Sequence, residues 1–174
     1  MEIRFDRITP GIQKYTKLMQ WVLETDVSRD MDFQRFYNGF YRMRQRNSAF
    51  YTSYYQFFEE NKHNQQLTFE DILHYLYGQT GQIHASFSSK MLATIRPEMP
   101  IWDKFVLQNL NLRAPYPYEK NRFEKVVQLY NYIIQWYSTE EAQNYLAIFN
   151  QHYPDAVMTD TKKIDWILWG IQER

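Results

Sequence analysis

"MLATIRPEMPIWDKFVLQNLNL" (Met91–Leu112) contains two apolar helical runs separated by a turn with two prolines. A residue that precedes proline is disfavoured in helical geometry, so the first run is expected to end near Arg96, just before Pro97. Aspartate is a favoured helix N-cap residue, so Asp103 is expected to start the second run. The stretch therefore predicts a helix, a rigid turn and a second helix, with one carboxyl group where the second helix begins.

The helical pattern extends in both directions from this stretch. Apolar residues recur three and four positions apart almost everywhere, and the alternation typical of strands is scarce. No repeat, low-complexity tract or linker interrupts the pattern. The chain is therefore predicted to be all-α, a single compact domain over residues 1–174 with about eight or nine helices.

Helix boundaries are expected from local signals. The expected helix starts outside Met91–Leu112 are Pro10-Gly11, Asp30 or Asp32, Ser48, Thr68 and Ser138. "TFED" and "STEE" have the capping-box spacing. In a capping box the side chains of Asp71 and Glu141 would accept hydrogen bonds from the backbone N–H groups of the cap residues Thr68 and Ser138. Gly78 is the expected stop of the helix that starts at Thr68. "GQTGQIHASFSS" (residues 78–89) is interpreted as a hairpin-like connection to the helix that carries Met91.

Composition excludes several classes of protein. The chain has 20 basic and 20 acidic residues, so no overall positive field attracts nucleic acid or anionic lipid. It has no cysteine, which excludes disulfides, thiol nucleophiles and thiolate-bound metals. The four histidines are scattered without ligand spacing, so we expect no metal site, and no cofactor motif is present. Without an apolar leader or a long apolar run, the chain is expected to be cytoplasmic, with no membrane partner.

The densest basic cluster is "RMRQR", which contributes Arg42, Arg44 and Arg46. Beside tyrosines such as Tyr41 and Tyr51, these side chains could contact phosphates while the rings stack on bases. The alternative is that they are the solvated end of the second helix, where cations also favour the helix dipole.

"IHASFSSKMLATIRPEMPIWDKFVLQNLNL" (Ile83–Leu112) carries a resemblance. Lys90 follows the expected hairpin, Pro100-Ile101-Trp102-Asp103 forms a Pro-x-x-Asp step, and Leu110-Asn111-Leu112 ends the second helix. In this order the segment resembles the core of the helix-hairpin-helix DNA glycosylase superfamily. The resemblance implies a helix-hairpin-helix core with Asp103 as the catalytic carboxylate, facing a flipped nucleotide.

The resemblance also implies a DNA contact near the hairpin. The glycines of that family's hairpin are replaced here by "HASFSS", so Lys90 and the hydroxyls of Ser86, Ser88 and Ser89 are the expected phosphate contacts. "YGQTGQ" has no lysine to form a Schiff base, so an active enzyme would be a monofunctional glycosylase-like hydrolase.

Three hypotheses follow. The chain is a DNA-associated glycosylase relative with altered or lost base excision, a noncatalytic all-α module that binds a protein or nucleic acid, or an unrelated helical protein. In the last two, Asp103 is only a helix cap, which is worth about 1 kcal/mol. The partner, the substrate and the oligomeric state are left open by the sequence.

Overall fold

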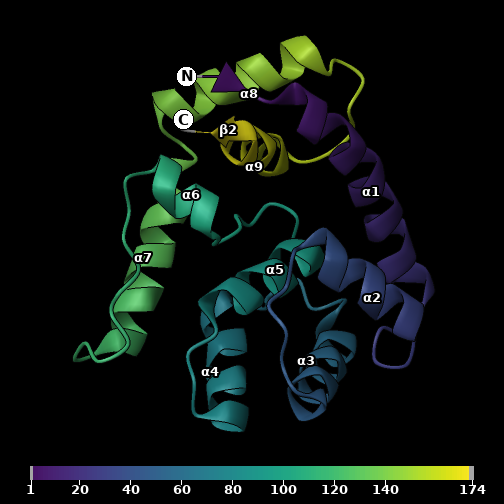
Figure 1. Ribbon diagram of the computed structural model, residues 1–174, viewed down its shortest axis with the longest axis vertical. Coiled ribbons are helices and arrows are strands. Elements are labelled where there is room, and N and C mark those ends of the chain that lie inside the picture. The colour runs from purple at the N-terminus through teal and green to yellow at the C-terminus, as the bar shows by residue number, and fades with distance from the viewer. Residues whose placement is uncertain (1, 173–174) are drawn as a thin grey trace. The chain divides into compact units, whose positions relative to one another are not determined.

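The computed structural model describes residues 2–172 (Figure 1). The elements are β1 (Glu2–Ile3), α1 (Phe5–Glu24), α2 (Met31–Phe40), α3 (Ser48–Asn61), α4 (Phe69–Thr80), α5 (Ala85–Ile95), α6 (Lys104–Asn109), α7 (Arg122–Trp136), α8 (Glu140–His152), α9 (Asp160–Gly170) and β2 (Ile171–Gln172). Within these residues there are nine helices, and the only sheet is the antiparallel pairing of the two-residue strands β1 and β2. The predicted all-α class is confirmed.

The chain forms two compact units. One unit is Thr9–Ile95, and the other joins the residues up to Ile8 to those from Arg96 onward. The single domain expected over residues 1–174 stays a prediction. No helix in residues 2–172 is both long and apolar enough to cross a bilayer.

The unit Thr9–Ile95 has an aromatic core. In this unit α4 packs against α3 and α5, and Tyr37, Tyr54 and Phe58 are completely buried. The hydroxyls of Tyr37 and Tyr54 lie 2.9 Å apart, and that of Tyr54 also donates to the carbonyl oxygen of Phe87 at 3.0 Å. Buried hydroxyls need such partners because an unpaired polar group costs free energy away from water. The tyrosines can therefore fill the core without leaving these hydroxyls unsatisfied.

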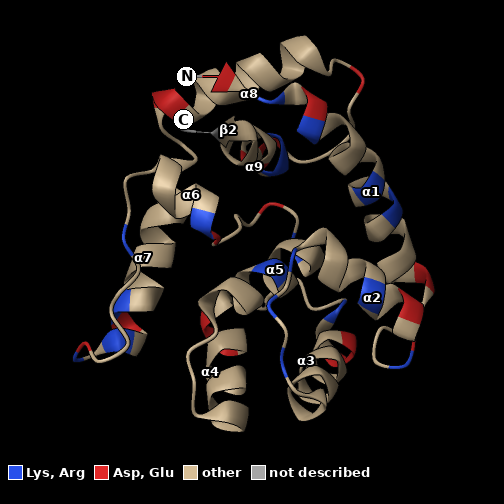
Figure 2. Ribbon diagram, viewed as in Figure 1, with Lys and Arg blue, Asp and Glu red and all other residues tan. Residues whose placement is uncertain are grey.

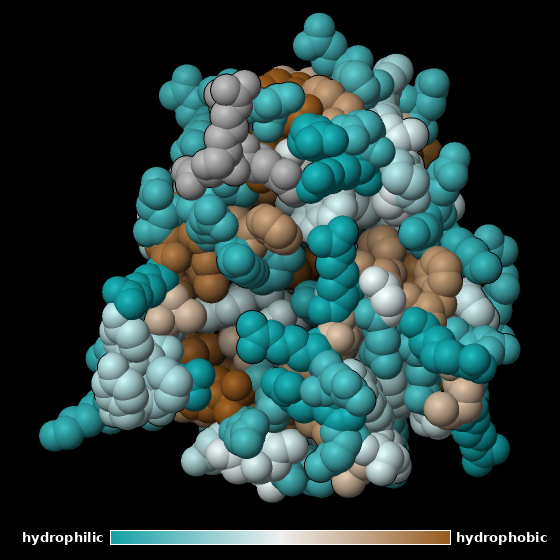
Figure 3. Space-filling view, viewed as in Figure 1, coloured by the Kyte–Doolittle hydropathy of each residue, from teal (hydrophilic) through white to brown (hydrophobic). Residues whose placement is uncertain are grey.

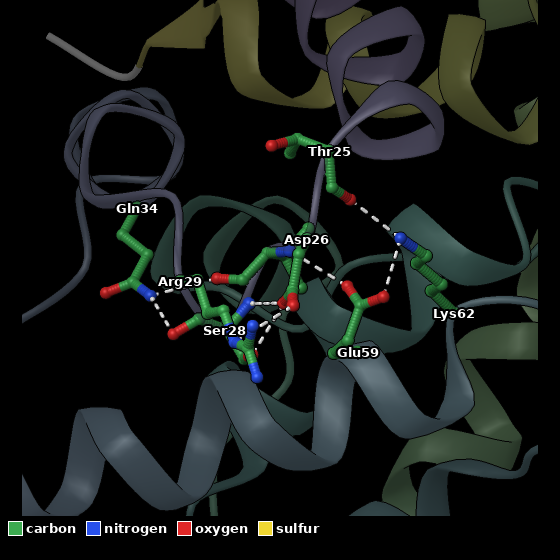
Figure 4. A network of polar contacts seen from close by, with 8 residues as sticks. Thr25, Asp26, Ser28, Arg29, Gln34, Glu59 and Lys62 are labelled. Atoms are coloured by element: carbon green, nitrogen blue, oxygen red, sulfur yellow. Dashed lines mark hydrogen bonds and ion pairs between the residues drawn. The ribbon is translucent and has the colours of Figure 1, made fainter.

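The connection between α1 and α2 is fixed by side chains of α2, of α3 and of the residue that caps the C-terminus of α3 (Figure 4). Glu59 accepts a hydrogen bond from the backbone N–H of Val27 at 2.8 Å and pairs with Lys62 at 2.7 Å. The ammonium group of Lys62 also donates to the carbonyl oxygen of Thr25 at 2.7 Å, and Gln34 donates to that of Val27 at 2.9 Å. Side chains thus satisfy three backbone groups of a six-residue connection that has no regular structure of its own.

The second unit is built around α9, which packs against α8 and α6 (Figure 1). Its fully or almost fully buried side chains are Tyr130, Ile133, Phe149, Ile164, Ile167 and Leu168. Gly170 allows close packing, since a Cβ there would lie 2.7 Å from Cδ1 of Ile8. The amide of Asn109 donates to the carbonyl oxygen of Leu168 at 2.6 Å, which ties α6 to the end of α9. Ile164, Ile167 and Leu168 form the buried apolar face of α9.

Several helix boundaries differ from expectation. α1 starts at Phe5, so Pro10 lies inside the helix rather than before it. The side chain that caps α3 is Asn47, whose Oδ1 accepts the N–H of Phe50 at 2.9 Å, and not Ser48. The cap of α8 is Thr139, because Ser138 still belongs to the turn that closes α7. The capping box of Thr68 and Asp71 is confirmed, as is Asp30 as the cap of α2.

The connection before α5 is shorter than expected. α4 continues past Gly78 and ends at Gly81, which has the left-handed geometry (φ 67°) that favours glycine. α5 then starts at Ala85, so Ser86–Ser89 are helical and do not form a hairpin-like loop. Serine has only moderate helix propensity, but α5 is buried along most of its length, and packing outweighs that preference.

Candidate functional site

Asp103 is the N-cap of α6. Its backbone is extended, and Oδ1 accepts hydrogen bonds from the N–H groups of Phe105 at 2.8 Å and Val106 at 3.0 Å. Among residues 2–172, the hydrogen bonds to this carboxylate both use Oδ1 and both come from the first turn of its own helix. The predicted cap is confirmed, and the predicted catalytic role stays a prediction.

The turn before Asp103 is firmly held. Ile101 and Trp102 are buried, and the hydroxyl of Tyr130 donates to the carbonyl oxygen of Pro100 at 2.7 Å. The hydroxyl of Thr159, the cap of α9, donates to the carbonyl oxygen of Pro97 at 2.6 Å. The turn is therefore bound at both prolines by side chains of α7 and of the residue that caps α9.

A buried cluster of charged and polar side chains lies in the same unit. Lys162 and Asp165, one turn apart on α9, are each about 5% exposed, and Lys162 Nζ lies 3.8 Å from Asp165 Oδ2. The hydroxyl of Tyr137, just after α7, donates to Oδ1 of Asp165. Oδ2 of Asp165 has no hydrogen-bond partner. Asp165 is thus ion-paired through one oxygen and hydrogen-bonded through the other.

Burial controls the pKa values in this cluster. It raises the pKa of Asp165 to about 6, because the charge of Lys162 and the hydrogen bond from Tyr137 only partly offset the lost hydration. It lowers the pKa of Lys162, although the charges of Asp165 and Asp103 act in the opposite direction. Perturbed groups of this kind occur at functional sites and also in structural ion pairs. Here the groups are closed to solvent, which favours the structural role.

Sequence reasoning missed this cluster. "KKIDWILWG" (residues 162–170) predicts a helix with an apolar face and tryptophans beside it, and no buried ion pair. The signal was Lys162 and Asp165, three residues apart and flanking the buried Ile164. Charged residues at that spacing can pair along one helix face, and here that face is the buried one.

The basic cluster Arg42–Arg46 begins in the turn that closes α2, where the N–H of Arg42 donates to the carbonyl oxygen of Gly39 at 3.3 Å, and continues into the irregular segment before α3. Arg42 is held at a φ of 48°, and both Arg42 and Arg44 are exposed. Tyr51 secures the segment by donating its hydroxyl hydrogen to the carbonyl oxygen of Arg44 at 2.9 Å. Arg46 instead turns inward, with its guanidinium 5.1 Å from the ring centre of Phe87. Two of the three arginines are thus on the surface, and their contact with phosphate stays a prediction.

The other expected phosphate contacts lie on α5. Ser88 and Ser89 have no exposed surface, Lys90 is 8% exposed, and Ser86 is half-buried. A phosphate cannot approach fully buried hydroxyls, so their position does not favour the expected contact. These residues form part of the buried side of α5, where the Thr94 hydroxyl donates to the carbonyl oxygen of Lys90 at 2.8 Å. Their assignment to nucleic acid stays a prediction.

Histidine provides no metal centre in the described part of the chain. No group of three or more histidine, aspartate or glutamate side chains in residues 2–172 could hold a metal ion. His84 is buried against Phe50 and Phe87, and its Nε2 lies 3.0 Å from the hydroxyl oxygen of Thr80. Burial, with a smaller effect of the charge of Arg46, lowers its pKa to about 4. His84 is therefore a neutral core residue at physiological pH.

No protein-family model, curated protein or solved structure matches the chain. The resemblance of Ile83–Leu112 to the helix-hairpin-helix DNA glycosylases stays a prediction.

Proposed function

We propose that the chain is a noncatalytic helical protein that associates with nucleic acid on a glycosylase-like scaffold that has lost base excision. The observation that carries the proposal is the commitment of Asp103 to helix α6, where Oδ1 accepts both of its hydrogen bonds from backbone N–H groups. A catalytic carboxylate must place its negative charge against positive charge developing on the sugar. Two N–H donors oppose that interaction, since they already neutralise part of the same charge.

Association with nucleic acid is supported by the surface of the segment between α2 and α3. Arg42 and Arg44 are exposed, and Tyr51 holds the backbone that carries them. Two cations make few phosphate contacts, and the chain as a whole is neutral, so the binding should be weak and sensitive to salt.

A binding experiment with labelled DNA tests the proposed association with nucleic acid. A fluorescein-labelled duplex should bind the wild-type chain at low salt and dissociate as salt is added. The double variant Arg42→Gln, Arg44→Gln should bind several-fold less tightly, whereas Arg35→Gln, an exposed arginine on α2 that is paired with Asp32, should bind as the wild type does. Equal binding by both variants, or no wild-type binding at low salt, would contradict the proposal.

A base-excision experiment tests the claim that the chain is noncatalytic. Duplexes containing uracil, an alkylated purine or an oxidised purine are incubated with the wild-type chain, and abasic sites are detected by alkaline cleavage. We expect no cleavage above that of a reaction without protein. Cleavage that disappears in Asp103→Asn would show that the chain is catalytic, and would not contradict its association with nucleic acid.

A second candidate is a noncatalytic protein-interaction module. It is favoured by two exposed apolar side chains on either side of the connection between α1 and α2: Leu23 near the end of α1 is 65% exposed, and Met31 at the start of α2 is 61% exposed. A second copy of the chain is the partner that can be tested directly. Sedimentation should then show association that Leu23→Glu abolishes, and a monomer at all concentrations would argue against this partner.

A further inference from the structure

The loop between α6 and α7 presents aromatic rings to solvent. The rings of Tyr116 and Tyr118 are stacked, with centres 5.6 Å apart and planes at 12°. The guanidinium of Arg113 lies 4.3 Å from the ring centre of Tyr116. Tyr118 is 84% exposed although its ring stacks on Tyr116, so most of its surface reaches water. A large ring left in solvent contributes little to folding, since the hydrophobic gain comes from removing apolar area from water.

The rings are held in place by a turn. Glu119 donates its backbone N–H to the carbonyl oxygen of Tyr116 at 3.1 Å, and Pro117 occupies the second position, where its fixed φ favours the turn. The Glu119 side chain accepts the N–H of Tyr116 at 3.0 Å and pairs with Lys125 of α7 at 2.6 Å. The hydrogen bond from Lys125, followed by that from Tyr116, lowers the pKa of Glu119. The aromatic pair is thus anchored to α7 before any ligand arrives, which reduces the entropy lost on binding.

The charge beside these rings is positive. Residues 113–125 contain four basic and two acidic side chains, and one acid, Glu119, is already paired with Lys125. Figure 2 shows the blue of lysine and arginine along the loop and at the start of α7. In Figure 3 the projection at the lower left, where Figure 1 places this loop, is hydrophilic to near-white. Lys120 is exposed, whereas Arg122 is half-buried and its Nε is closed to solvent without a hydrogen-bond partner.

An exposed aromatic pair beside cations matches the chemistry of single-stranded nucleic acid. Every base has a π-face that stacks on an aromatic ring, and the backbone next to it carries phosphates that attract lysine and arginine. A duplex does not offer this contact, because its bases are stacked on one another. A purely apolar partner would not explain the surrounding cations.

We propose that Arg113, Tyr116 and Tyr118 form a stacking platform for an unpaired base of single-stranded DNA or RNA, with Lys120 and Arg122 facing its backbone. The proposal rests on the proposed association with nucleic acid and specifies a substrate class for it. It uses residues other than Arg42 and Arg44, so the two surfaces can be tested separately.

The test measures fluorescence anisotropy of a labelled single strand of about 12 nucleotides, a length within the usual site size. Wild-type chain should bind it more tightly than the matching duplex. Tyr118→Ala should weaken single-strand binding about tenfold, as expected for the loss of one base stack, whereas Tyr118→Phe keeps the ring and should bind normally. Tyr132→Ala is the matched control, because Tyr132 is an exposed tyrosine on α7 (51%) outside the platform.

A second measurement locates the contact. A strand carrying iododeoxyuridine is irradiated in the complex, and the crosslinked peptide is identified by mass spectrometry. The proposal predicts a crosslink within residues 113–122, lost in Tyr118→Ala.

The outcomes separate the two proposals. Equal binding of single strand by wild type and Tyr118→Ala, with duplex binding still dependent on Arg42 and Arg44, overturns the platform and keeps the association. Loss of binding only in Tyr118→Ala supports the platform and overturns the role of Arg42 and Arg44. If the wild-type chain binds neither the single strand nor the duplex at low salt, both the platform and the association with nucleic acid are overturned. That result is expected if the platform binds a peptide instead.

Discussion

Tyr137 donates its hydroxyl hydrogen to Oδ1 of Asp165, and both side chains are buried. The bond joins the residue that follows α7 to helix α9. It comes from a side chain, and the Asp165 carboxylate accepts it through Oδ1. It stabilises a charge that burial disfavours, since an ionised carboxylate away from water needs donors.

Tyr137→Phe should therefore destabilise the chain in a pH-dependent way. At pH 8, where Asp165 is ionised, we expect the free energy of unfolding to fall by about 1.5–3 kcal/mol, the usual size for a bond to a charged group. At low pH the protonated carboxyl needs the donor less, so the loss should shrink. Urea unfolding at both pH values checks this, with Tyr132→Phe as an exposed control; an equal loss at both would contradict it.

Asp165→Asn should change how stability depends on pH. The folded pKa of Asp165 is about 6 against an ordinary 3.8, so between these pH values the folded chain keeps a proton that the unfolded chain has released. The free energy of unfolding should therefore fall as pH rises through this window, by up to about 3 kcal/mol. In Asp165→Asn this fall should be absent, while Asp160→Asn, an exposed aspartate on the same helix, should retain it. The same fall in Asp165→Asn would show that Asp165 is not its source.

His84→Gln should reveal the opposite dependence. The folded pKa of His84 is about 4 against an ordinary 6.5, so within this window the unfolded chain binds a proton that the folded chain does not. His84 therefore makes the free energy of unfolding rise with pH, and His84→Gln should lose that rise. His74→Gln, on an exposed side chain of α4, is the control; matching pH profiles for the two variants would refute the assignment.

Glu59→Ala should loosen the connection between α1 and α2. Glu59 accepts the N–H of Val27 and pairs with Lys62, and its loss leaves both without that partner. We expect the free energy of unfolding to fall by about 1–3 kcal/mol and the amide of Val27 to exchange faster with deuterium. Glu60→Ala, one residue further along α3 and exposed, should do neither. An unchanged exchange rate at Val27 would count against this role.

The sequence allowed most of the helices to be predicted, because helical periodicity is a local property. The predictions that failed depended either on packing between residues far apart in the sequence or on a shift of one residue at a helix boundary. Ser86–Ser89 were interpreted as loop, but packing around α5 keeps them helical. β1 was missed because two residues are too few for a strand pattern, and its partner β2 lies at the other end of the chain.

The candidate site was predictable only in part. Asp103 was identified as a cap from its position after Pro100 and before an apolar run, and the structure places it there. Lys162 and Asp165 were missed because a charged pair three residues apart usually lies on the solvent side of a helix, and only the packing of α9 against α8 and α6 buries it. The stacking of Tyr116 on Tyr118 was not predictable from "RAPYPY" (residues 113–118), because it depends on the turn that Glu119 closes.

The most direct test of the account is the free energy of unfolding of Asp103→Asn and Asp103→Ala. Asparagine caps helices about as well as aspartate, so Asp103→Asn should stay within a few tenths of a kcal/mol of the wild type, and Asp103→Ala should lose about 1 kcal/mol. A carboxylate kept for catalysis often reduces stability, so its removal would be neutral or stabilising. A gain of stability in Asp103→Ala, or an equal loss in both variants, would contradict the assignment of Asp103 as a helix cap.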